Sequence, residues 1–142
     1  MYRAEDNSAQ GIGSRTSRLG YATSTDGIHF ERDTKPAFYP AKDNQVENEC
    51  PGGTEDPRIA MTEDGTYVLL YTQWNRKVPR LAVATSKDLK HWTKFGPAFE
   101  KAYNGKFKDE ATKSASLVTT LKGDKQVIAK VNGKYFMYWG EK

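Results

Sequence analysis

The sequence predicts an all-β protein built as part of a β-propeller. An internal repeat with an offset of 62 residues is the first observation that predicts it. The second is a series of short segments that are patterned as strands and separated by tight-turn residues. Each unit of about sixty residues then holds about four short antiparallel strands, as a propeller blade does. No segment carries a long helical period, so we expect no long helix.

The repeat is clearest where a short strand runs into a turn. Residues 19–30 read Leu-Gly-Tyr-Ala-Thr-Ser-Thr-Asp-Gly-Ile-His-Phe, and residues 81–92 read Leu-Ala-Val-Ala-Thr-Ser-Lys-Asp-Leu-Lys-His-Trp. Both copies then reach Pro-Ala-Phe, at 36–38 and 97–99. The Ser and Asp side chains of each copy can bond nearby backbone amides and close a tight turn. Because His29 and His91 are equivalent, we expect both to be structural.

Two further segments supply strands that pair across Asx-Gly turns. Residues 64–71 begin with Asp-Gly and residues 132–139 begin with Asn-Gly, and each continues as an aromatic and aliphatic strand. We expect the preceding strands at 58–61 and 125–131. Trp92, Tyr138 and Trp139 follow strand patterns and are expected in the core.

The blade boundaries follow from this pattern. We expect the end of one blade at about 1–40, a whole blade at about 52–101 and the start of the next at about 112–142, all within one domain. Because a propeller must close its ring, we expect the chain to be a fragment of a longer protein. We expect this fragment by itself to be inactive and poorly soluble, since open sheet edges are exposed.

Composition excludes several classes of function. The net charge is +4, but Lys and Arg are scattered among 18 acidic residues, which does not indicate a nucleic-acid partner. No apolar run is long enough for a membrane span. The two histidines are 62 residues apart and Cys50 has no partner, so no metal-ligand spacing exists.

Residues 52–58, Gly-Gly-Thr-Glu-Asp-Pro-Arg, are the most informative stretch. The two glycines let the backbone turn sharply or come close to a ligand, and Pro57 favours an extended Asp56. The motif therefore predicts a rigid loop that enters a strand and holds a charged side chain. On a regular strand, Glu55 and Asp56 would face opposite sides, and Arg58 would lie on the side of Asp56 and lower its pKa.

Four segments together resemble glycoside hydrolase family 130. They are Arg3-Ala-Glu-Asp6, residues 52–58, Tyr71-Thr-Gln-Trp-Asn75 and residues 81–92. This family contains five-bladed β-propellers that are β-mannoside phosphorylases or β-mannosidases. The resemblance implies cleavage of β-mannosidic linkages with inversion, Asp56 as the proton donor, and no cofactor apart from inorganic phosphate as co-substrate in a phosphorylase.

The resemblance and the residue types also suggest binding residues. The candidate contacts to a β-mannoside oligosaccharide are Arg3, Asp6, Glu55, Arg58, Trp74 and Asn75. The candidate phosphate contacts are Arg76, Lys77, Arg80, Lys94 and Lys113. Guanidinium groups suit phosphate because their forked donors match two oxygens at once. Lys94 stands before Gly-Pro, where an Arg would be the better phosphate ligand, which argues against a standard phosphate site.

Three alternatives stay open at this stage. The reaction is either phosphorolysis or hydrolysis by a β-mannosidase that does not use phosphate. A furanosidase-type propeller also carries an Asp-Pro motif. A non-catalytic glycan-binding propeller would bind sugar without needing Asp56. The linkage, the compartment (cytoplasmic or periplasmic) and homo-oligomer formation are undecided by the sequence.

Overall fold

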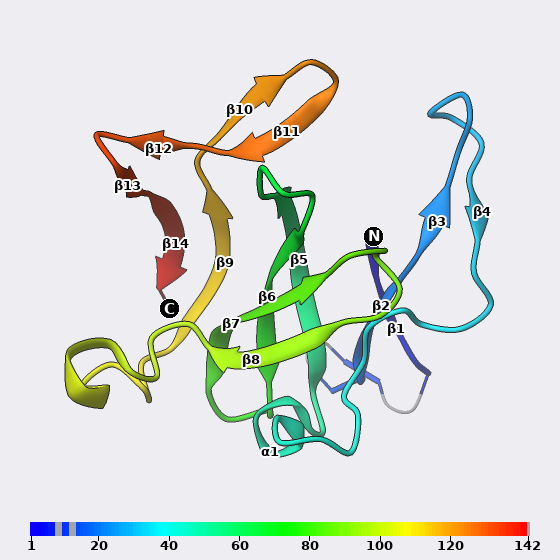
Figure 1. Cartoon of the computed structure of the whole chain (residues 1–142). Helices are drawn as coiled ribbons and strands as arrows, with labels where there is room; N and C mark the ends of the chain where they lie inside the picture. The colour runs from blue at the N-terminus through cyan, green and yellow to red at the C-terminus, as the bar shows by residue number, and fades with distance from the viewer. Residues whose placement is uncertain (8–9, 12–13, 142) are drawn as a thin grey trace.

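The computed structural model describes residues 1–7, 10–11 and 14–141, and confirms an all-β chain that forms part of a β-propeller (Figure 1). Its strands are β1 (Tyr2–Glu5), β2 (Ser17–Gly20), β3 (Ala22–Thr23), β4 (Glu31–Arg32), β5 (Gly53–Met61), β6 (Tyr67–Trp74), β7 (Pro79–Ser86), β8 (Thr93–Pro97), β9 (Thr112–Leu117), β10 (Thr119–Lys122), β11 (Lys125–Ile128), β12 (Lys130–Val131), β13 (Lys134–Tyr135) and β14 (Met137–Glu141). The helical segments are α1 (Val46–Glu49) and a 3₁₀ turn at Ala102–Gly105. No described helix is long and apolar enough to cross a membrane.

Strands β5, β6, β7 and β8 form a four-stranded antiparallel meander, which lies in the segment predicted as a whole blade. Side chains of β6 alternate between its two faces. Leu69 and Tyr71 pack with Leu19 and Phe38 on one face. On the other face Leu70 packs in a second cluster with Leu81 and Ala115. The meander therefore has a core on each side.

Neighbouring segments flank this meander on both sides. Strand β1 pairs antiparallel with β2, and β2 meets β5 at Ser17 and Gly53. On the Leu70 side of the meander, β9 pairs antiparallel with β14. The β10–β11 hairpin lies between β9 and β14 in the sequence and extends away from them (Figure 1). The predicted strand pairing across the Asn132-Gly133 turn is confirmed, since β12 pairs antiparallel with β13. The single strand expected at 125–131 is divided into β11 and β12, and β14 pairs with β9.

The structure confirms the repeat through equivalent hydrogen bonds. The Ser24 hydroxyl accepts the amide of Gly27 at 2.8 Å, and the Ser86 hydroxyl accepts the amide of Leu89 at 2.8 Å. The backbone amides of both Pro-Ala-Phe alanines also donate to equivalent carbonyls. Ala37 donates to Leu19 at 3.0 Å and Ala98 donates to Leu81 at 2.8 Å.

Both histidines belong to these turns, as predicted. His29 Nδ1 lies 2.6 Å from Asp26 Oδ2, and His91 Nδ1 lies 2.6 Å from Asp88 Oδ2. The hydrogen bond to the histidine and the bonds from backbone amides hold the pKa of each aspartate well below its usual range. Each histidine ring therefore helps to close its turn by binding the aspartate of the same turn.

Of the three aromatic side chains expected in the core, Trp92 packs there and Tyr138 and Trp139 do not. Phe30 is 58% exposed, whereas its counterpart Trp92 packs against the first core cluster. Tyr138 is 73% exposed and Trp139 is 45% exposed, so the expectation that they are core residues is wrong for the described chain. Strand β14 pairs only with β9 among the described strands, which leaves one of its edges open.

Gly53 permits the closest contact between β2 and β5. Its φ is +114°, and a Cβ built on it would lie 2.2 Å from the carbonyl oxygen of Ser17 and 2.4 Å from the Ser17 nitrogen. The Ser17 amide donates to the Gly52 carbonyl at 2.8 Å. Glycine fits this position because it has no Cβ and adopts a positive φ without strain.

We expect Gly53→Ala to destabilise the full-length protein, by which we mean the natural polypeptide that carries residues 1–142. The added Cβ meets backbone atoms that cannot rotate away, and the positive φ adds strain, so the loss should reach about 3 kcal/mol or more. Urea unfolding measures it. Gly65→Ala is the matched control, because Gly65 has φ +80° with nothing within 4 Å of a Cβ. This control should lose only about 1–2 kcal/mol, and equal losses in both variants would contradict the close-approach argument.

Candidate active site

A β-bulge at Asp56 shapes the candidate site. Glu55 pairs with Thr72 and Arg58 pairs with Leu70, so Asp56 and Pro57 together face one residue of β6. Asp56 has a φ of +47°, in the left-handed region that aspartate tolerates better than most residues. Bulges of this kind are frequent beside active sites, where they redirect a side chain.

The bulge brings two adjacent carboxylates to one guanidinium. Arg3 Nη2 lies 3.0 Å from Glu55 Oε1, and Arg3 Nη1 lies 3.6 Å from Asp56 Oδ1. The expectation that these carboxylates face opposite sides is therefore wrong, because the bulge breaks the strand alternation. Arg58 is exposed and its Nη1 donates to the Pro57 carbonyl at 3.0 Å, so Arg3 supplies the positive charge beside Asp56.

Ser17 joins Arg3 and Glu55 in a closed set of hydrogen bonds. Arg3 Nε donates to Ser17 Oγ at 3.1 Å, and Ser17 Oγ donates to Glu55 Oε1 at 3.0 Å. Burial raises the pKa of Glu55, while Arg3 and the Ser17 hydroxyl act against that rise. Glu55 therefore fixes the orientation of the guanidinium that faces Asp56.

A hydroxyl from β9 completes the surroundings of Asp56. Ser114 Oγ donates to Asp56 Oδ2 at 3.1 Å. Ser114 was not among the residues selected from the sequence, because β9 lies outside both matched repeat segments and carries no turn or motif signal. The carboxyl of Asp56 keeps an exposed fraction of 27%, so a ligand can reach it for proton exchange.

The remaining candidate sugar contacts have other partners. Asp6 accepts from Arg18 at 2.7 Å. Trp74 lies against the Gly52 backbone, where a Cβ would come within 2.2 Å of Trp74 Cδ1. Asn75 Oδ1 accepts the amide of Lys77 at 3.0 Å, so its oxygen closes the β6–β7 turn. The structure does not bring Asp6 or Asn75 into contact with the Asp56 carboxyl.

The candidate phosphate contacts are dispersed. Arg76 donates to the Ser14 carbonyl, and Arg80 lies 3.3 Å from Asp109 and also donates to the Lys108 carbonyl. Lys77 is exposed in the β6–β7 turn, and Lys113 precedes Ser114 on β9. Among the described contacts, Arg3 is the cation that meets the Asp56 carboxyl.

Lys94 lies in a buried ion pair. Its Nζ contacts Glu49 Oε2 at 2.5 Å and Asp43 Oδ2 at 3.0 Å, on the Tyr71 face of β6. The fully buried Glu49 also accepts from the Tyr71 hydroxyl at 2.8 Å and from Gln73 at 3.2 Å. The candidate phosphate ligand Lys94 is thus not brought to Asp56, because the buried Glu49 carboxylate holds its charge.

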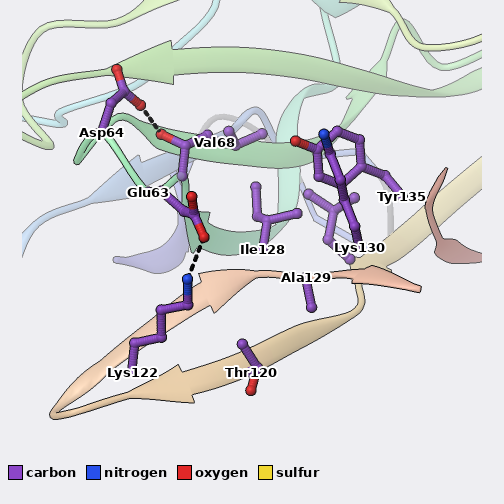
Figure 2. A pocket seen from close by; sticks show the side chains of 11 residues that line it. Glu63, Asp64, Val68, Thr120, Lys122, Ile128, Ala129, Lys130 and Tyr135 are labelled. Carbon is purple, nitrogen blue, oxygen red and sulfur yellow. Dashed lines mark hydrogen bonds and ion pairs between the residues drawn. The ribbon is translucent and has the colours of Figure 1, made fainter. Parts of the chain in front are cut away.

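A separate cavity of about 880 Å³ lies at the other end of β5. It is bounded by the β5–β6 turn, by the β10–β11 hairpin and by Tyr135 (Figure 2). Lys122 of β10 donates to Glu63 in the turn across this cavity. Asp56 does not line it. Among the described residues no group of three or more His, Cys, Asp and Glu side chains is placed to hold a metal ion.

Comparison with known families agrees with the resemblance seen in the sequence. A family model described as β-1,4-mannooligosaccharide phosphorylase, glycoside hydrolase family 130, matches residues 2–142. This chain belongs to glycoside hydrolase family 130. The match covers all three parts of the site, since it includes Arg3, Asp56 and Ser114.

Solved structures and a curated relative give the family context. A candidate glycoside hydrolase from Parabacteroides distasonis ATCC 8503 is 99% identical with a TM-score of 0.97 over 99% of this chain and 40% of that chain. A second structure, at 65% identity and TM-score 0.95 over 98% of this chain and 39% of that chain, comes from work on family members that are glycoside hydrolases targeting β-1,2 mannosidic linkages in Candida mannan. A 1,2-β-oligomannan phosphorylase of Thermoanaerobacter sp. (strain X514) is 38% identical over 96% of this chain and 40% of its own length. The chain thus spans about 40% of these relatives.

We expect Lys94→Met to destabilise the full-length protein by about 3–5 kcal/mol near neutral pH, because it leaves a buried carboxylate unpaired. Burial raises the pKa of Glu49 and Lys94 opposes that rise, so the folded variant should hold the Glu49 proton to higher pH. The unfolded chain releases it near its ordinary value of about 4.3, so stability should fall as pH rises above this value.

Urea unfolding at about pH 5 and about pH 8 measures this loss, which should be larger at the higher pH. Lys77→Met is the matched control at an exposed position. A Lys94→Met variant with unchanged stability and a selectively weakened response to phosphate would contradict the structural role.

Proposed function

We propose that the full-length protein hydrolyses β-1,2-mannosidic linkages with inversion, and that Asp56 is the proton donor. The observation that carries the proposal is the bulge, which presents the Asp56 carboxyl between Arg3 and Ser114 within a family 130 motif. Membership of the family supports the reaction class. The β-1,2 linkage is supported by two relatives, since the work on the 65% identical structure concerns β-1,2 mannosidic linkages and the 38% identical relative is a 1,2-β-oligomannan phosphorylase.

The chemistry needs a carboxylic acid that reaches the glycosidic oxygen. Cleavage requires a proton for a poor leaving group and stabilisation of a transition state resembling an oxocarbenium ion. Asp56 has an accessible carboxyl, which Arg3 and Ser114 contact from two sides. An inverting hydrolase also needs a carboxylate base on the opposite face of the sugar. Glu55 does not suit that role, because Ser17 and Arg3 occupy its carboxylate.

Hydrolysis is favoured over phosphorolysis because the 65% identical structure comes from work on family members that are glycoside hydrolases, whereas the named phosphorylase is 38% identical. In addition, two of the candidate phosphate contacts already have carboxylate partners, since Arg80 is paired with Asp109 and Lys94 is paired with buried Glu49. Water, the nucleophile in hydrolysis, needs no cluster of cationic side chains to bind it, in contrast to phosphate. Phosphorolysis is the second candidate, and the specific observation in its favour is the resemblance to a named phosphorylase.

The first test follows product formation from β-1,2-mannobiose with and without inorganic phosphate. We expect free mannose at equal rates in both conditions, and we expect Asp56→Asn to lower kcat by about 10²- to 10⁴-fold. Asp124→Asn, at an exposed position in the β10–β11 turn, is the matched control and should retain activity.

Other products distinguish the alternatives. Mannose 1-phosphate formed only with phosphate would establish phosphorolysis in place of hydrolysis. Full activity in Asp56→Asn would remove the proton donor assignment. Sugar binding without either product would support a non-catalytic glycan-binding propeller.

A further inference from the structure

We propose that Ser114 is a positioning residue for Asp56, which holds the carboxyl through its Oδ2 atom while the Oδ1 atom faces Arg3. The contact joins two separate sheets, since Ser114 lies on β9 and Asp56 lies on β5. This inference rests on the proposed role of Asp56 and assigns a function to a side chain outside the family motifs identified in the sequence.

The backbone at both ends of this contact is unusual. Ser114 has a φ of +52° and Asp56 has a φ of +47°, so two non-glycine residues in the left-handed region meet through their side chains. Such conformations cost about 1–3 kcal/mol each, and they concentrate at active sites. Serine gains no local advantage from this conformation, in contrast to glycine. The position of the hydroxyl is therefore maintained at a cost in strain.

Strand β9 holds Ser114 rigidly against the meander. The Ser114 amide donates to Thr72 Oγ1 at 3.4 Å. Thr112, two residues earlier, accepts the amide of Leu81 at 3.1 Å through its hydroxyl. Ala115 is buried in the core cluster with Leu70 and Leu81. These contacts fix the strand at positions before, at and after Ser114, so the hydroxyl has a defined place.

A hydroxyl suits both protonation states of a proton donor. It donates to a carboxylate and accepts from a carboxylic acid, so it can follow Asp56 through the reaction without moving. In the described structure it donates to Oδ2. The charged groups around Asp56 in the described chain are the adjacent Glu55 of β5 and Arg3 of β1, whose guanidinium also pairs with Glu5 at 2.5 Å. Ser114 is the neutral member of this set.

Two variants of the full-length protein test the role of the hydroxyl. Ser114→Gly removes it and relieves the positive φ, whereas Ser114→Ala removes it and keeps the strain. We expect the same result from both, with kcat lowered about 10-fold and KM changed less than about 2-fold.

Ser116→Ala is the matched control, since Ser116 is an exposed serine on the same strand. A kcat within about 2-fold of the parent would overturn the inference, while an inactive Asp56→Asn variant would leave the proposed function standing. A rise in KM alone would also overturn it, because Ser114 would then contact substrate. Activity lost only in proportion to folded protein would assign a structural role and would overturn it as well. An active Asp56→Asn variant would overturn both proposals.

Discussion

The contact between the Ser17 backbone and Gly53 is the constraint on which the candidate site depends. The chain packs here so closely that a single Cβ would lie 2.2 Å from a carbonyl oxygen. This contact places β2 beside the start of β5, and β1 follows because it pairs with β2. Arg3 and Ser17 then meet Glu55 two residues beyond Gly53. The lack of a side chain at Gly53 thus determines the position of Arg3, which lies fifty residues earlier in the sequence.

The bulge at Asp56 changes the direction in which the side chains of β5 point. In a regular strand Glu55 and Asp56 would diverge, and their charges would act on different faces. The extra residue at the bulge turns both carboxylates to the same guanidinium. The energetic cost of the left-handed Asp56 is balanced by contacts from β1 and β9. Strain, charge pairing and strand packing are therefore parts of one arrangement.

The distribution of basic residues shows how burial decides the use of a charge. Lys94 and Arg3 are both cations in the sequence, but the structure gives them different surroundings. Lys94 neutralises a carboxylate that has no access to water, whereas Arg3 remains partly exposed beside Asp56. A buried carboxylate without its partner is costly, so Lys94 contributes to folding. Arg3 retains the access to ligand that a site needs.

The sequence by itself determined the features that depend on neighbouring residues. The Ser and Asp turns around 24–29 and 86–91 are encoded locally, because hydrogen bonds within a few residues decide them. The strand segments of the meander follow from the residue pattern and from the turns between them. Membership of the family was also readable from the motif around Asp56. Only the tertiary structure decided that Glu55 and Asp56 share Arg3, that Ser114 reaches Asp56, that Lys94 pairs with Glu49 and that β14 pairs with β9. The physical reason is that these contacts join strands far apart in sequence, and their register is set by packing and by a bulge that no local pattern encodes.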